Sequence, residues 1–247
     1  MLGLVTLDID HVTKRFVQTM ALDDLSFRVP RGSIFGFLGA NGAGKTTTMR
    51  ICLGILRADA GSVSWDGLAT TDLPRRTWGY LPEERGLYPR MSVLDQLVYF
   101  ASLYGMAPDR ARHDARSWLT RFRIPDYADR RAEELSKGNQ QKVQFIAAIL
   151  HEPGVLLMDE PFTGLDPVNL ALLREAFVEL AAEARNSSTD EYPSERERPE
   201  VKLADVQLVL DGDGLRAVLD TGAEAVSHQA FWFAWSQFHP GTVVWAS

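Results

Sequence analysis

The chain has 247 residues, of which 45% are hydrophobic, and its formal net charge is −7 at pH 7. This length permits one large domain or a domain with an appendage. The acidic balance argues against a nucleic-acid-binding surface, and the single cysteine, Cys52, excludes an intramolecular disulfide or a multi-cysteine metal site. Met1 begins no secretory signal, and no apolar run approaches the roughly 18 residues that span a bilayer. We therefore expect a cytoplasmic protein that reaches a membrane only through a partner.

A phosphate-binding loop is the strongest motif in the chain. Residues 39–46 read GANGAGKT and fit G-x-x-x-x-G-K-[ST]. The glycines let successive backbone N–H groups point at an anion, Lys45 suits the β- and γ-phosphates, and the Thr46 hydroxyl suits Mg²⁺. A buried strand over residues 34–38 and a helix over residues 47–53 are predicted on either side. This context predicts a nucleoside triphosphate site.

Two helices are predicted in the middle of the chain. Ser92 caps a helix that runs to about Tyr104, and its apolar residues recur at helical spacing, which core packing explains. A second helix over residues 111–122 is rich in arginine, which we interpret as a solvated face.

Residues 135–142, LSKGNQQK, open a further helix that continues through Ile149. Ser136 is a suitable N-cap, and Gly138 permits a phosphate to approach the backbone closely. Many ordinary helices also start with serine and glycine, so the pattern alone does not establish a binding site.

Residues 154–160, GVLLMDE, predict a buried strand with two acids at its carboxyl end, where open α/β sheets bind ligands. Asp159 would hold Mg²⁺ as the acidic partner of Thr46, and Glu160 would orient or deprotonate an attacking water. The alternative is an ordinary strand followed by a charged turn.

The order of the phosphate loop, LSKGNQQK, LLMDEP and residues 164–167, GLDP, resembles an ABC-type ATPase. Residues 1 to about 184, including GYLPEERGLYPRMSVLDQL, are similar to the ATP-binding subunit of ABC-2-type export systems. The resemblance implies an α/β fold: a P-loop NTPase core with an antiparallel β subdomain and an α-helical subdomain at about residues 90–150. We expect an ATPase domain over residues 1–185.

The resemblance also implies roles for individual residues. Phe16 would stack on adenine, and the start of the LSKGNQQK helix would contact the γ-phosphate held by an opposite subunit, across an interface that includes Asp166. The residues expected to bind the nucleotide are Phe16, Gly39, Asn41, Gly42, Ala43, Gly44, Lys45, Thr46, Thr47, Ser136, Gly138 and Asn139. For Phe16 a plain core position is the alternative.

Glu83 stands where most ABC ATPases have a glutamine that senses Mg²⁺ and the attacking water. The export branch also carries an acid there, so the resemblance implies that Glu83 reaches the metal, with Thr46 and Asp159, and takes part in catalysis with Glu160 and Lys45. A solvated loop residue is the alternative.

After Arg185 the chain departs from the family. Residues 186–200 are polar and read as a linker, and residues 201–247 form a tail with a predicted hairpin, at residues 206–210 and 215–219, and an aromatic segment at 230–240. We interpret this as a truncated ATPase joined to a foreign tail, by gene fusion or by a frame or assembly error. The family's next strand, which ends in a γ-phosphate-sensing histidine, is not found. His228 would replace that histidine, or is an ordinary histidine of the tail, and residues 206–210 would fill the gap in the sheet without a histidine. If neither fills it, buried backbone groups of a central strand lack partners.

The sequence leaves three functions open. The first is the ATP-binding and ATP-hydrolysing subunit of an ABC exporter, with Mg²⁺, a second ATPase subunit in a homo- or heterodimer, and a membrane permease that holds it at the inner face of the membrane. The second is a truncated or fused remnant that binds ATP but hydrolyses it poorly. The third is a soluble ABC protein that acts on nucleic acid, which the acidic balance disfavours.

Overall fold

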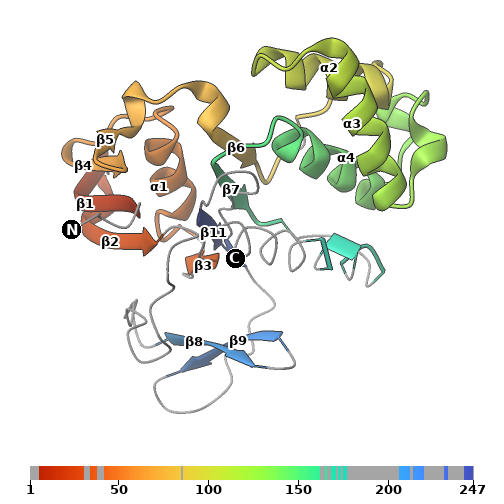
Figure 1. The fold of residues 1–247 in the computed structure, drawn as a ribbon. Coiled ribbons are helices and arrows are strands. Elements are labelled where there is room, and N and C mark those ends of the chain that lie inside the picture. Colours follow the sequence, from red (N-terminus) through yellow and green to blue (C-terminus); the bar gives the residue numbers. More distant parts are fainter. Residues whose placement is uncertain are drawn as a thin grey trace.

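The computed structural model describes residues 6–30, 34–37, 42–84, 86–161, 165, 168–170, 172–173 and 175–176, together with the backbone of strands at 206–211, 214–219, 231–232 and 242–246. Figure 1 shows sheets on one side and a group of helices on the other, connected through β6 and β7. The expected α/β architecture is present.

The N-terminal part of the chain forms an antiparallel sheet with the strand order β2-β1-β4-β5. Its strands are β1 (Thr6–Phe16), β2 (Thr19–Pro30), β4 (Ala60–Trp65) and β5 (Leu68–Ala69). Along β1, Leu7 and Ile9 are buried while the intervening Asp8 is only half-buried and Asp10 is exposed. This alternation is typical of a sheet with one face on the core.

A second sheet holds the site. It joins β3 (Ile34–Phe37), β6 (Trp78–Leu81), β7 (Val155–Asp159), β10 (Phe231–Trp232) and β11 (Thr242–Ala246). β11 pairs in parallel with both β3 and β7, β7 pairs in parallel with β6, and β10 pairs antiparallel with β11. All five residues of β7 are buried, as a central parallel strand requires.

The strand between β3 and β7 is therefore β11. The alternative that residues 206–210 fill this place is wrong, because β8 (Val206–Asp211) pairs with β9 (Gly214–Leu219) as an antiparallel hairpin. The hairpin itself is confirmed. The linker at 186–200, Asp166 and His228 lie outside the described residues.

The helices agree with the predicted ones: α1 (Lys45–Cys52), α2 (Val93–Leu103), α3 (Pro108–Arg121) and α4 (Lys137–Ile149). The described residues also include 3₁₀ helices at Thr70–Asp72, Arg75–Thr77, Pro125–Tyr127 and Ala132–Glu134. On α2 the apolar stripe packs into the core, where Leu97 and Ala101 are fully buried. On α3 Arg110 is 57% exposed and pairs with Asp114 and Glu152, which confirms a solvated arginine face there. No helix in the described part of the chain is long and apolar enough to cross a bilayer.

A histidine links the helices to the second sheet. His151 Nε2 lies 3.0 Å from the backbone carbonyl oxygen of Trp78, and the His151 ring stacks at 3.8 Å on Tyr104, which follows α2. Burial lowers the pKa of His151 to about 4. The imidazole is therefore neutral at pH 7, and Nε2 carries the proton that it donates to Trp78.

We expect this histidine to make the protein acid-sensitive. Because its pKa is about 4 in the folded chain and ordinarily 6.5, the unfolded chain binds the extra proton as the pH falls from 6.5 to 4. The free energy of unfolding should drop by up to about 3 kcal/mol across that window. His151→Gln keeps a hydrogen-bond donor but has no group that titrates. Denaturation curves of this variant at several pH values should therefore lack the drop in the free energy of unfolding between pH 6.5 and 4. An equal acid dependence in both proteins would contradict the assignment.

Candidate functional site

The phosphate loop is described from Gly42 onward; Gly39, Ala40 and Asn41 lie outside the described residues. Gly42 has φ 83° and Gly44 has φ 86°, so both adopt the left-handed conformation that favours glycine. A Cβ on Gly44 would lie 2.3 Å from the backbone oxygen of Ala21 in β2. The loop is thus held tightly against the first sheet at Gly44.

α1 starts directly after this loop. Gly44 is its N-cap and offers no side-chain cap, and the first turn contains no acidic residue. The first N–H groups of a helix have no intrahelical partner, and the helix dipole adds partial positive charge there. Ala43 is exposed, whereas Thr47, like Thr46, is half-buried. This end of α1 suits a phosphate.

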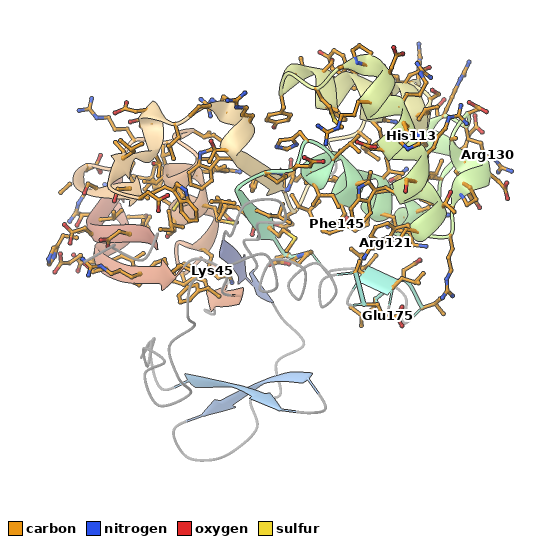
Figure 2. All side chains as sticks on the ribbon, viewed as in Figure 1. Lys45, His113, Arg121, Arg130, Phe145 and Glu175 are labelled. Atoms are coloured by element: carbon orange, nitrogen blue, oxygen red, sulfur yellow. The ribbon has the colours of Figure 1, made fainter. Side chains whose placement is uncertain are left out.

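Lys45 and Thr46 lie where the loop meets the second sheet. The Lys45 side chain is only 7% exposed, and Figure 2 shows it at the start of α1, away from the group of helices. The Thr46 hydroxyl donates a hydrogen bond of 2.8 Å to Asp159 Oδ2, at the end of β7. This bond brings together the two residues that the sequence predicts to hold Mg²⁺.

Acidic groups gather around this bond. Asp159 is 3% exposed, and burial raises its pKa to about 6. The nearby negative charges of Glu83 and Glu160 contribute to this rise, whereas the Thr46 hydrogen bond and the Lys45 charge oppose it. Concentrated negative charge of this kind favours a bound cation.

The oxygen donors fit Mg²⁺. Mg²⁺ is usually bound by one or two carboxylates together with phosphates and water. Among the described residues, no three His, Cys, Asp or Glu side chains converge as a complete metal site. The Thr46 hydroxyl and the Asp159 carboxylate therefore suit a metal that brings phosphate oxygens with it.

Glu160 follows Asp159 in an uncommon conformation. Its φ is 48°, and its side chain is half-buried. Left-handed backbone at a residue other than glycine costs about 1–2 kcal/mol and is found at functional sites. The Gln141 side chain of α4 donates to the carbonyl of Pro161 at 3.2 Å, which fixes the segment after Glu160.

Glu83 lies in an exposed loop that α4 holds in place. The Gln144 amide donates to the carbonyls of Pro82 at 3.3 Å and Glu84 at 3.0 Å, on both sides of Glu83. Glu83 nevertheless reaches Asp159 electrostatically. Exposure alone agrees with the solvated-loop alternative, whereas this charge coupling favours a role at the site.

Sequence reasoning missed two residues of this neighbourhood. Gln144 lies just after the LSKGNQQK stretch, and its helical position was the only available signal. Tyr80 of β6 has its pKa raised to about 12 by burial and by Asp159, while a hydrogen bond with Arg50 works in the opposite direction. No motif marked Tyr80.

The start of α4 faces solvent. Ser136 caps the helix by accepting a 3.3 Å hydrogen bond from the Asn139 N–H. Ser136 and Lys137 are exposed, Asn139 is half-buried, and Gly138 is buried. This end of the helix is therefore available to a partner molecule.

Phe16 ends β1 and is 44% exposed, with the Lys14 ammonium 5.6 Å from its ring centroid. A core aromatic would be covered, so the core alternative for Phe16 is wrong. An exposed ring beside a cation is suited to stacking on a flat partner such as a base.

Comparison with known proteins agrees with this geometry. The family model for the ABC transporter matches residues 22–163. The chain is 56% identical over 174 residues to the uncharacterized ABC transporter ATP-binding protein YhaQ of Bacillus subtilis, covering 70% of this chain and 58% of that protein. It is 36% identical over 199 residues to the Nod factor export ATP-binding protein I of Paraburkholderia xenovorans, covering 78% of this chain and 64% of that protein. The chain thus spans less than two thirds of these relatives.

Solved structures lead to the same family. An ATP-binding subunit of an ABC transporter superposes with a TM-score of 0.63 at 32% identity, over 73% of this chain and 75% of that one. CbiO1 of Clostridium perfringens, part of the ABC transporter complex cbiONQ, gives 0.61 at 25% identity over the same shares. The phosphate loop, the Thr46–Asp159 bond and the capped α4 all lie inside the matched region. The chain therefore belongs to the ABC transporter family and has the P-loop fold of its ATP-binding subunits.

Proposed function

We propose that this chain is the subunit that binds and hydrolyses ATP to power an ABC-type membrane exporter. The hydrogen bond between Thr46 and Asp159 is the observation that carries the proposal. It brings a phosphate loop and a buried carboxylate together beside Lys45, which is the arrangement that phosphoryl transfer needs.

Each group has a role in this proposal. The loop N–H groups and Lys45 hold the phosphates, and Phe16 stacks on the adenine. Thr46 and Asp159, with Glu83 nearby, hold Mg²⁺, which when bound neutralises charge on the phosphate oxygens. Glu160 orients the attacking water and accepts its proton.

A second ATPase subunit completes the site. Ser136, Gly138 and Asn139 at the start of α4 would reach the γ-phosphate held by the other chain, in a homo- or heterodimer. Closure of the two chains would then couple hydrolysis to a membrane permease. The export name of one relative and the multi-subunit complex of CbiO1 support such partners. In this proposal the permease holds the chain at the inner face of the membrane.

Phe16→Ala should weaken ATP binding. Base stacking on an aromatic ring contributes about 1–3 kcal/mol, so we expect a dissociation constant raised by roughly 5- to 150-fold. Val17→Ala is the matched control, because Val17 is adjacent and 96% exposed. Fluorescence titration with a labelled ATP analogue measures both. Equal affinities would place the base elsewhere.

A specific observation favours a second function, an ATP-binding subunit with little turnover. The strand between β3 and β7 reads TVVWA and contains no histidine. Purified chain should be assayed for Mg-ATP binding and turnover, and its co-purification with membrane protein or with nucleic acid should be determined. Binding without turnover supports this second function; co-purification with nucleic acid instead of membrane protein contradicts the exporter.

A further inference from the structure

We propose that β11 positions the two halves of the nucleotide site relative to one another. The inference rests on the proposed function, because it assigns β11 a role in ATP and Mg²⁺ binding. β11 is distant in sequence from the strands that it joins, since Ala246 follows Asp159 by 87 residues.

The strand register carries the proposal. On one edge of β11, Val243 pairs with Ile34 and Ala246 with Phe37, the last residue of β3. β3 leads into the phosphate loop. On the other edge, Thr242 pairs with Val155 and Val244 with Leu157 of β7. β7 ends at Asp159.

The spacing of the site therefore depends on β11. Neighbouring strands lie about 4.8 Å apart, so inserting one strand sets β3 and β7 about 10 Å apart. The Thr46–Asp159 bond of 2.8 Å must span this separation from α1, directly after the loop, to the end of β7. Without β11, both β3 and β7 would lose a row of backbone partners, and nothing in the sheet would fix that separation.

The first test is a disulfide scan with matched pairs. In the first protein, Ile34→Cys and Val243→Cys place cysteines at two paired positions of β3 and β11. In the control, Ile34→Cys and Val209→Cys place them in β3 and in β8 of the hairpin. The native Cys52 is buried and its thiol pKa is raised to about 12, so it should stay reduced under mild oxidation at pH 8. We expect peptide mass spectrometry to find the first disulfide only. Formation of the second in place of the first would overturn the proposal.

The second test compares Val244→Pro in β11 with Val209→Pro in β8. A proline has no backbone N–H, so in a strand paired on both edges it removes a hydrogen bond to a neighbouring strand. We expect Val244→Pro to weaken Mg-ATP binding at least tenfold and to weaken ATP binding without Mg²⁺ less, since the Thr46–Asp159 spacing matters most with the metal. Val209→Pro should leave both affinities within twofold. A Val244→Pro protein that remains folded and binds Mg-ATP normally would overturn the proposal.

If Val244→Pro does not fold, the Ile34→Cys/Val243→Cys protein decides. Its Mg-ATP affinity should be unchanged or higher in the oxidised, locked form than in the reduced form, and a tenfold loss on locking would contradict the role. The proposed function fails separately: a chain that forms the predicted disulfide but never binds ATP keeps the strand placement and loses the ATPase assignment.

Discussion

Glu160→Gln should abolish most ATP turnover while ATP still binds. Removing a positioned general base costs about 10²- to 10⁴-fold in rate. The dissociation constant for Mg-ATP should change by no more than about threefold, below the tenfold that 1.4 kcal/mol produces. Glutamine keeps the size of the side chain, and Glu160 directly follows Asp159, the last residue of β7. Phosphate release gives the rate, and titration with an ATP analogue gives the affinity.

Glu133→Gln is the matched control, because it removes a carboxylate that is 48% exposed on the helical side of the molecule. It should leave rate and affinity unchanged. If Glu160→Gln binds ATP and turns it over like the original chain, Glu160 is not the base. If the original chain already shows no turnover above Glu160→Gln, the binding-only function replaces the ATPase.

The local parts of the site could be predicted because they depend on short-range chemistry. A glycine-rich loop between a strand and a helix has few other uses, and serine caps predict helix starts, as Ser92 and Ser136 both show by accepting an N–H three residues on. The proximity of Thr46 to Asp159 followed from the rule that parallel strands present their carboxyl ends at one edge.

The long-range parts could not be predicted in this way. Gln144 donates to carbonyls 62 and 60 positions away in the chain, at Pro82 and Glu84, and a glutamine in a helix carries no signal for such a contact. β11 is a short apolar strand without a turn that ties it to β3 or β7. Hydrophobicity indicates that such a strand is buried but not which gap it fills, so residues 206–210 were named for this place in the sequence analysis and residues 242–246 were not singled out.

Gly44→Ala should damage the site more than Gly42→Ala, the same change at the other glycine in the described part of the loop. Its left-handed φ costs alanine about 1–2 kcal/mol, and the new Cβ would meet the Ala21 carbonyl at 2.3 Å and Leu22 at 2.6 Å. A backbone oxygen cannot rotate away, so overpacking adds about 1–3 kcal/mol. We expect a loss of roughly 2–5 kcal/mol in the free energy of unfolding, measured by urea denaturation.

ATP affinity should fall with it, because relief of the clash moves the start of α1, and with it Lys45 and Thr46, away from β2. Gly42→Ala separates the two causes: Gly42 has nearly the same φ, 83°, but apart from its chain neighbours no described residue has an atom within 4 Å of the added Cβ. That variant should lose only the conformational cost, about 1–2 kcal/mol. Equal losses in the two proteins would mean that backbone strain alone matters and that contact with β2 does not hold the loop. A larger loss for Gly44→Ala, in stability and in affinity together, would show that the first sheet fixes the phosphate loop from one side.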